Sequence, residues 1–489
     1  MLQDLNRKER VSKIRAIANS MEVQEMEMYR DYYEGIHFVK SDITKTDYGS
    51  KKIYKVTTRS GIELYDSFTE EDKPVVKANW CSPIVDTIGD YTRGVSDKIV
   101  ITSDQKEEEL QSIWKENKLD LLVHEVAYHA GIYGKTYLRL KRRDKSAPIE
   151  IKQILPTSVY ENLNIISGER ESVVYWFLID REQAKKLYDV KIESDEVYYF
   201  EEWTNETIHK YVDGVQVNEV DDKVVKDINP YGFIPFFEVA CNINRQSDIS
   251  NVISLNDTLN LTMTYISEIL KYSAFPMLAP KGNYTNDTPI LSPEQLEEVS
   301  ISPSTILPIP MERINGEGVD KSVLDHIVQL EKDISIVSGV PIKLLTAEFD
   351  GNLSGIALQR MLGSVLRQAE QRRNYIGTTL KDINNRIIEL LGGKETETKV
   401  LFPEMMRIDM NERLDEMLKK QTIGISKETI LDELGYDYAE EKERNDQDFE
   451  MEDRIMKEEE ILTANDNQIN DKSGIQSNTK TSEKKGTSA

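Results

Sequence analysis

Two short stretches carry residues whose types and spacing are typical of catalysis or metal binding. The first, Gly134-Lys135-Thr136, ends like a phosphate-binding P-loop, whose backbone amides cradle the phosphates of a nucleotide. That loop requires a glycine five positions before Gly134, where this chain has His129. It also lies between a strand and a helix, whereas the pattern here predicts a helix first and a strand afterwards. We therefore predict a helix-to-strand turn and no nucleotide site.

The second stretch, His124-Glu125 followed by His129, is similar in composition to a zinc-protease helix. Two histidines share one metal ion when they lie four positions apart, but a spacing of five turns the imidazoles about 140° apart on a helix. The chain has 5 histidines, and no other pair suggests a metal site. Cys81 and Cys241 are far apart and predict neither a disulfide framework nor a zinc site. No nucleophile elbow is present, so we predict no catalytic residue, no metal and no cofactor, which favours a structural or binding role.

An aromatic run from Val197 to Tyr211 would suit the stacking of nucleic-acid bases. Aromatic side chains that alternate along a β-hairpin more often pack across the strands and into a core. We therefore expect this run to be structural.

Composition limits the classes of function. The chain has 489 residues, 39% hydrophobic and 30% charged, which is enough for a large core in two to four units. Its formal net charge of -25 argues against a protein that grips nucleic acid over a broad basic surface, but it allows one that surrounds DNA without holding it. The N-terminus MLQDLNRKER lacks the apolar centre of a signal peptide, and no run approaches a membrane span. We expect an intracellular, reducing site of synthesis and no membrane partner.

The first half is predicted to be α+β, with helices first and short strands later. Turn residues between β-prone runs predict hairpins at Arg59-Ser60-Gly61 and at Asp213-Gly214. Helices are expected at residues 1 to about 35, at 79–95, after Asp104 and at 119–132, and strands at 137–140, 150–155, 173–179 and 197–202.

The second half is predicted to be mainly helical. Ser247 or Asp248 is expected to cap an amphipathic helix that ends at Pro276, and a second helix follows from Val319 to Gly339. The segment between them is rich in Pro, Gly, Asn and Ser but keeps apolar residues, so we expect a small folded insert on a helical hairpin. Further along, we expect a strand at KVLFPE and helices at 411–420 and 426–434. An acidic stretch at 440–460 is expected to be either a solvated helix or an extended arm, and the polar end is expected to be disordered.

The longest helical pattern runs from Ser354, its expected N-cap, to Gly393. Its apolar residues recur every 3.6 positions or so, with one gap at Arg372, and it would be roughly 57 Å long. Basic residues outnumber acidic ones along it, against the trend of the chain. Arg360 and Arg367 lie seven positions apart on the face opposite the apolar stripe. Either salt bridges within or between subunits, or contact with a polyanion, would account for that face.

Six stretches follow one another in a distinctive order: HEVAYHAGIYGKTYLRLKRRD, EIKQILPTSVY, NPYGFIPFFEVACN, SDISNVISLNDTLN, GVPIKLLTAEFDGNLSGIALQRML and IGISKETILDELGYDYAEEKERNDQD. In number and order they resemble the portal proteins of tailed bacteriophages, specifically the family typified by the portal of the Bacillus phage SPP1. The likeness covers nearly the whole chain except the polar tail.

The resemblance implies a portal fold, which is α+β and mainly α-helical. Its expected regions are a wing (1–244), a first stem helix (245–274), a clip (275–318), a second stem helix (319–340), a tunnel loop (341–353), a long wing helix (354–393), a helical crown (394–462) and a disordered tail (463–489).

The resemblance also implies a function. Such portals form rings, usually dodecamers, at one capsid vertex, and double-stranded DNA passes through them without sequence specificity during packaging and ejection. The clip would dock the terminase large subunit and later the head-tail adaptor, while major capsid and scaffolding proteins would be further partners. The protein would be made in the host bacterial cytoplasm, would reside in the virion at the portal vertex, and would not be an enzyme.

Site residues follow from the same resemblance. Arg360 and Arg367 would face the channel or a neighbouring subunit. Because the tunnel-loop sequence AEFDGN is acidic, contact with phosphate there would require backbone amides or Lys343. The expected tunnel-loop residues are Lys343, Leu344, Leu345, Thr346, Ala347, Glu348, Phe349, Asp350, Gly351, Asn352 and Leu353, and the expected docking residues of the clip are Asn283, Tyr284, Asn286, Asp287, Glu294, Glu297 and Glu298.

Two other classes of function stay open on the sequence. One is another virion structural protein, such as a minor capsid or scaffolding protein, although the Pro-rich insert between matched helices argues against a simple scaffold. The other is a hydrolase or NTPase acting on nucleic acid, which the failed P-loop and the lack of a metal motif disfavour.

A largely acidic wall with sparse basic points suits a conduit, because it repels and centres a duplex that it must not retain.

Overall fold

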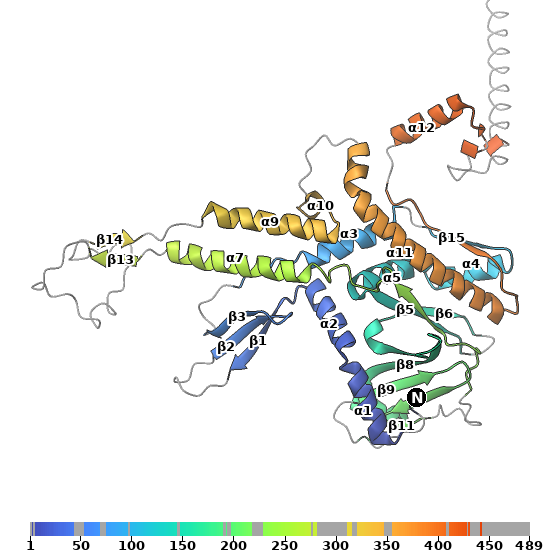
Figure 1. Cartoon of the computed structure of the whole chain (residues 1–489). Helices are drawn as coiled ribbons and strands as arrows, with labels where there is room; N and C mark the ends of the chain where they lie inside the picture. The colour runs from blue at the N-terminus through green and yellow to red at the C-terminus, as the bar shows by residue number, and fades with distance from the viewer. Residues whose placement is uncertain are drawn as a thin grey trace, which may run out of the picture. The chain divides into compact units, whose positions relative to one another are not determined.

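The computed structural model describes most of the chain up to residue 442 (Figure 1). The described residues are 2, 5–43, 53–68, 75–95, 98–143, 147–188, 192, 197–217, 228–274, 277–280, 311–314, 320–346, 355–406, 410–427, 429–430 and 441–442. The chain divides into two compact units, Met1–Arg407 and Ile408–Ala489. The first unit combines helices with small sheets, so the mixed α/β architecture predicted from the sequence is confirmed.

The chain begins with two helices, α1 (Arg7–Ala18) and α2 (Met21–Tyr33), so the prediction of one helix over residues 1 to about 35 was wrong. Asn19 ends α1, and the hydroxyl of Ser20 accepts a hydrogen bond from the Val23 amide at the start of α2. Short polar side chains compete for backbone groups in this way, which is why two of them in a row interrupt a helical pattern.

The described strands form small antiparallel sheets, and the hairpins expected at Gly61 and at Asp213-Gly214 are confirmed. Gly61, Asp213 and Gly214 all have positive φ, as tight hairpin turns require. The sheets have the strand orders β1-β2-β3, β11-β10-β9-β8-β7, β12-β5-β6, β13-β14 and β15-β4. The strands are β1 (Phe38–Ile43), β2 (Ile53–Thr58), β3 (Glu63–Phe68), β4 (Val100–Ser103), β5 (Lys135–Lys141), β6 (Glu150–Ile154), β7 (Val159–Leu163), β8 (Arg170–Ile179), β9 (Val197–Trp203), β10 (Ile208–Val212), β11 (Val215–Gln216), β12 (Phe236–Ala240), β13 (Met277–Pro280), β14 (Met311–Ile314) and β15 (Thr398–Leu401).

The aromatic run of β9 and β10 is structural, as expected. Phe200 stacks on Tyr211 across the two strands, with ring centroids 4.9 Å apart. Both side chains lie in an apolar cluster with α1 and α2 residues. The cluster thereby fastens the N-terminal helices to the five-stranded sheet.

A long helix, α11 (Gly355–Leu390), crosses the body of the first unit and confirms the spine predicted from the sequence (Figure 1). Its apolar stripe packs against α3 (Cys81–Arg93), α5 (Leu119–Tyr133) and the sheet that contains β5 and β12. The shorter elements of this unit are α4 (Glu107–Glu116), a 3-10 turn (Pro156–Ser158) and α6 (Arg181–Tyr188). The main core therefore lies between α4, α5 and α11 on one side and the β12-β5-β6 sheet on the other.

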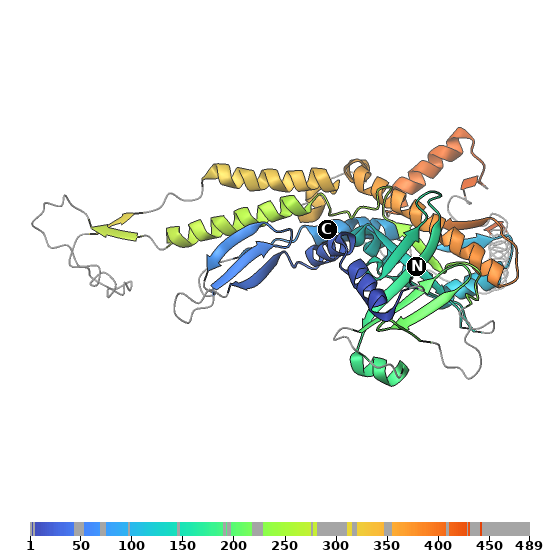
Figure 2. The same cartoon turned by 60° about the horizontal axis from the view of Figure 1, so that its bottom comes forward.

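Two antiparallel helices, α7 (Ile253–Ala274) and α9 (Lys321–Ser338), project from this body side by side (Figures 1 and 2). We call them the stem helices. In both views the β1-β2-β3 sheet lies beside α7. The hairpin of β13 and β14 follows the outer ends of the stem helices, and the rest of the expected clip lies outside the described residues.

The remaining elements differ in how far they match expectation. The expected strand at KVLFPE is β15, and the expected helix at 411–420 is α12 (Met410–Ile423) of the second unit. A short helix, α10 (Ile342–Thr346), occupies the first part of the expected tunnel loop. The expected N-cap of α11, Ser354, and the expected disordered tail lie outside the described residues.

Candidate functional site

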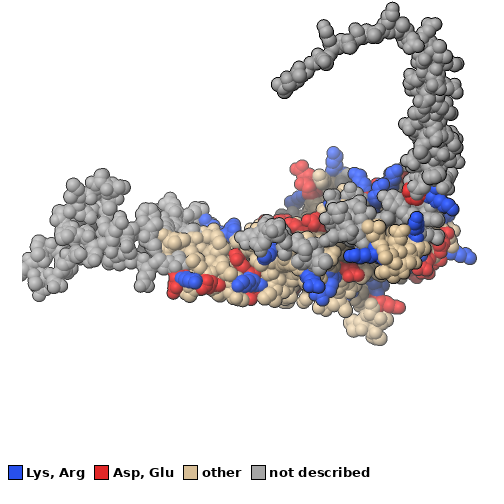
Figure 3. All heavy atoms as spheres, turned by 90° about the horizontal axis from the view of Figure 1, so that it is seen from above, with Lys and Arg blue, Asp and Glu red and all other residues tan. Residues whose placement is uncertain are grey.

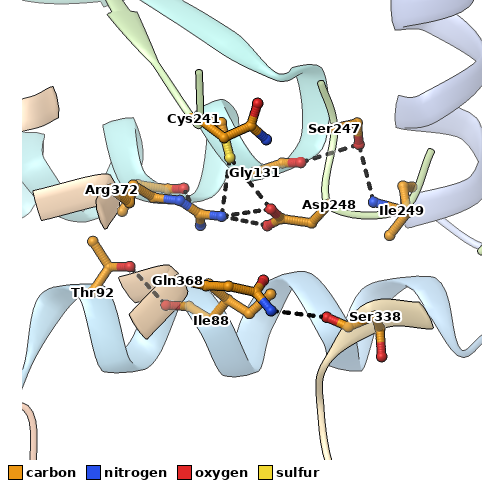
Figure 4. A network of polar contacts seen from close by, with 12 residues as sticks. Ile88, Thr92, Gly131, Cys241, Ser247, Asp248, Ile249, Ser338, Gln368 and Arg372 are labelled. Carbon is orange, nitrogen blue, oxygen red and sulfur yellow. Dashed lines mark hydrogen bonds and ion pairs between the residues drawn. The ribbon is translucent and has the colours of Figure 1, made fainter. Parts of the chain in front are cut away.

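The inner ends of both stem helices are fastened to one turn of α11 (Figure 4). Arg372, which is 1% exposed, occupies the gap in the apolar stripe and donates hydrogen bonds to both carboxylate oxygens of Asp248, at 2.7 and 2.6 Å. Asp248 precedes α7. Its carboxylate was predicted as a possible cap of the stem helix, but α7 begins only at Ile253 and the carboxylate serves this ion pair instead.

Arg372 has two further acceptors besides the Asp248 carboxylate. It donates to the Ala127 carbonyl oxygen of α5 and to the Cys241 sulfur, both at 3.1 Å. Burial is the largest influence and would by itself lower the pKa of Arg372, but the charges and hydrogen bonds of Asp248 and Cys241 together raise it above the ordinary value. For the Cys241 thiol, burial has the opposite effect and raises the pKa, so this sulfur remains protonated. The pair is therefore a fixed, charged link between α11, α5 and the start of the first stem helix.

One turn before Arg372, Gln368 holds the second stem helix. Its side-chain amide donates to the Ser338 carbonyl oxygen at the end of α9, at 3.1 Å (Figure 4). Gly339 follows with φ of +71, and a Cβ there would lie 2.5 Å from the Gln368 nitrogen. Only glycine permits this approach, which explains why α9 ends there. Residues four apart on α11 thus clamp the bases of both stem helices, and we call this contact the stem clamp.

The first three turns of α7 are fixed by a second device. The side chains of Asn256, Asn260 and Thr264 lie on one buried face of α7, four positions apart. They accept hydrogen bonds from the amides of Trp80 (3.1 Å), Ala78 (2.7 Å) and Val76 (3.0 Å), respectively.

The spacing of this ladder has a simple geometric cause. Four residues of helix rise about 6 Å, and two residues of extended chain span about 6.6 Å, so alternate amides of residues 76–80 meet successive turns of α7. The extended segment uses side chains of the helix in place of a neighbouring strand.

A buried carboxylate joins the same helix to the small sheet. Asp257 accepts hydrogen bonds from the hydroxyls of Tyr32 (2.6 Å) and Ser60 (2.5 Å). Burial raises the pKa of Asp257, and these hydrogen bonds only partly oppose it. His37, packed edge-on against Tyr32, contacts Asn256, and burial lowers its pKa to about 4. The base of α7 therefore rests on a buried polar cluster.

The basic residues of α11 divide into two groups. Arg372 and Arg373 are buried: Arg373 donates to the carbonyl oxygens of Thr92 and Pro403, and burial lowers its pKa to about 10. Arg360 and Arg367, in contrast, are exposed, as predicted from their spacing. Arg372 forms a salt bridge within the chain, but it lies in the apolar stripe and not on the face of Arg360 and Arg367, so both explanations of that face stay predictions.

The other expected site residues fall partly outside the described residues. Lys343, Leu344, Leu345 and Thr346 lie in α10 and are therefore helical, whereas 347–353 are not described. The docking residues expected in the clip, Asn283, Tyr284, Asn286, Asp287, Glu294, Glu297 and Glu298, are not described either. Their roles stay predictions.

The two chemistry-like stretches take ordinary structural positions. Gly134 ends α5 with φ of +85, and β5 starts at the next residue, so the predicted helix-to-strand turn is confirmed. His124 and His129 pack against Tyr128 and Tyr133 on the same helix. In the described part of the chain, no group of three or more His, Cys, Asp or Glu could hold a metal ion, and no helix is both long and apolar enough to cross a membrane.

Comparison with known proteins identifies a family. The family model for phage portal proteins of the SPP1 Gp6-like type matches residues 16–458. No curated protein matches the chain.

Among solved structures, the chain is similar to one titled as the virion of a native gene transfer agent particle, with a TM-score of 0.46 and 12% identity over 72% of this chain and 90% of that chain. The neck of the native particle, computed with C12 symmetry, gives a TM-score of 0.41 and 12% identity over 72% and 90% of the two chains. The neck of the empty particle, computed with C6 symmetry, gives 0.46 and 13% over 73% and 90%. Because the family model spans most of the chain, the protein belongs to the SPP1 Gp6-like family of phage portal proteins.

Proposed function

We propose that the protein forms a ring, with twelve subunits the expected number, at one vertex of a phage capsid, and that DNA passes through this ring during packaging and ejection. Membership of the portal family is the observation that carries the proposal. Proteins of this family are structural components of the virion and not enzymes, so hydrolysis of ATP would belong to the terminase.

The surface of the stem helices supports assembly into a ring. The stem clamp, the ladder and the α7–α9 contact bury only part of each helix. The rest of each helix surface carries exposed large apolar side chains: Tyr265, Ile269 and Leu270 on α7, and Leu324, Val328, Ile336 and Val337 on α9. Burying one such side chain contributes about 1.5–3 kcal/mol. Copies arranged around an axis would bury these side chains against each other, and such head-to-tail contacts close into rings.

The charge of the molecule supports passage without retention. The net charge of -25 per chain repels phosphate. On the face seen in Figure 3, Lys and Arg are interspersed with Asp and Glu over the described body and form no broad basic surface. A ring with such walls would centre a duplex instead of binding it tightly.

We assign regions on the same basis. The stem would be α7 with α9, the clip 275–318, and the tunnel loop 341–353, whose described part includes α10. The clip would dock the terminase large subunit and the head-tail adaptor, and capsid and scaffolding proteins would surround the ring within the virion. Arg360 and Arg367 would lie near the channel or a neighbouring subunit.

Mass photometry of matched variants tests the assembly. The wild type should give a species of twelve times the 56.3 kDa of one chain. Leu324→Asp with Val328→Asp, which charges one face of α9, should abolish that species while circular dichroism is unchanged. Ser322→Asp with Gln329→Asp, two exposed polar positions of the same helix, should leave it intact. If both double variants assembled equally well, the stem helices would be excluded from the contact between subunits.

A truncation tests the role assigned to the C-terminal tail. Deletion of 465–489 should leave the ring species unchanged, because the polar composition of that stretch offers little apolar surface for a subunit contact. Loss of rings in the truncated chain would show that the tail takes part in assembly.

A further inference from the structure

The solvent face of α11 carries a continuous polar stripe that the proposed function does not yet use. Its residues are all exposed and fall within about 60° of one line along the helix, since they are spaced by seven, four, three, four and three positions. They are Arg360, Arg367, Gln371, Asn374, Thr378 and Lys381. In the described part of the chain none of its three cations is ion-paired with a carboxylate. The stripe is thus a surface of hydrogen-bond donors with a charge of opposite sign to the chain.

The composition of this stripe matches one class of partner. Arg, Lys, Gln, Asn and Thr are the side chains that contact phosphate and sugar oxygens of nucleic acid without reading sequence. A subunit interface of a homo-oligomer would instead be rich in aliphatic and aromatic side chains. The chain exposes such side chains on its stem helices, but the stripe contains none.

The density of charge sets the strength of the contact. Three cations spread over roughly 30 Å of helix, whereas duplex DNA carries one charge every 1.7 Å or so. Glu370 flanks the stripe and Asp382 ends it, and both are exposed carboxylates that repel phosphate. A surface of this kind guides a duplex and releases it at physiological salt.

We propose that this stripe is a weak, sequence-independent contact for the phosphate backbone of double-stranded DNA. The proposal rests on the proposed function, because only a chain that surrounds DNA brings a duplex close enough for so sparse a contact. It extends the candidate residues from two arginines to a face along most of the spine helix.

Site-specific photocrosslinking tests the position of the contact. Both native cysteines, Cys81 and Cys241, are buried, so an exposed new cysteine can be labelled selectively. Asn374→Cys carrying a benzophenone should crosslink to a radiolabelled duplex of arbitrary sequence at low salt. Ser12→Cys, on the exposed face of α1, is the matched control and should give little product. Equal yields at both positions, or no product at position 374, would overturn the proposal.

A charge-removal variant tests the mechanism. Arg360→Gln, Arg367→Gln and Lys381→Gln together should lower the crosslinking yield at position 374. They should also make the apparent binding constant for the duplex less dependent on salt. The plot of its logarithm against the logarithm of the salt concentration should be shallower by about 0.9 for each lost phosphate contact. The control removes three exposed cations elsewhere and should change neither quantity: Lys8→Gln, Arg15→Gln and Lys115→Gln.

The failures of the two proposals are distinguishable. Rings that form normally in the charge-removal variant, without a change in crosslinking, would refute the stripe and leave the ring intact. Rings lost only in that variant would show that the stripe is a subunit contact, which also overturns the proposal. Absence of rings from the wild-type protein would contradict the proposed function itself.

Discussion

Replacing Arg372 by methionine tests the stem clamp, because it removes one half of a buried ion pair. The guanidinium is 1% exposed and makes two bonds to the Asp248 carboxylate, at 2.7 and 2.6 Å. Loss of one partner leaves the other charge buried without compensation, which costs about 3–5 kcal/mol. Arg372→Met should therefore lower the free energy of unfolding by that amount, and Asp248→Leu by a similar one.

The double variant separates the ion pair from the packing around it. When both charges are replaced by apolar side chains of similar volume, no buried charge is left unpaired, and the cost should fall well below the sum of the single variants. Urea unfolding followed by fluorescence reports on this directly, since the 4 tryptophans lie within the first unit. Amide exchange at the start of α7 should rise in each single variant.

A control on the same helix fixes the scale. Arg386 forms an exposed ion pair with Glu389 at 2.9 Å, so Arg386→Met should cost at most about 1 kcal/mol. If Arg372→Met cost no more than this control, or if the double variant equalled the sum of the singles, the stem clamp would not hold the stem in the way described.

Other positions give independent expectations. Gly134→Ala should destabilise the protein more than Gly61→Ala in thermal melts. Both have positive φ, which costs alanine about 1–2 kcal/mol, but a Cβ at Gly134 would lie 2.2 Å from a backbone oxygen, whereas at Gly61 nothing lies within 4 Å; a reversed order would contradict this. The pKa of His37 is lowered to about 4 by burial, so the unfolded chain binds its proton more readily. Its contribution to stability is present above about pH 6.5 and is lost as pH falls toward 4, and His37→Asn should flatten stability over that window relative to wild type. Asn260→Ala should lower the free energy of unfolding by about 1–3 kcal/mol and speed hydrogen exchange of the Ala78 amide, which donates its hydrogen bond to Asn260. Thr258→Ala, an exposed position on the same helix, should do neither, and equal effects of the two variants would refute the role of the ladder.

Periodicity was enough to predict the spine helix and both stem helices, because their apolar stripes repeat over many turns. It even marked Arg372 as the one interruption. The partner of Arg372 was not predictable, since Asp248 is 124 residues away in sequence and its position before a helix suggested a cap. Its carboxylate turned out to neutralise a buried cation, a tertiary demand that outweighs local capping.

The ladder on α7 had a signal in the sequence that was missed. Asn256, Asn260 and Thr264 recur every four positions, which predicts a polar stripe on the helix. A polar stripe on a helix suggests a face exposed to solvent. Only the fold shows that the extended segment of residues 76–80 lies along this one. The prediction of one continuous N-terminal helix was wrong because the break depends on two residues, Asn19 and Ser20. The helical spacing of the residues on either side of them masked this local signal.

Negative-stain electron microscopy of the purified full-length protein tests the central claim most directly. The account predicts rings with a central hole about as wide as duplex DNA. Monomers, or filaments without a central channel, would contradict it.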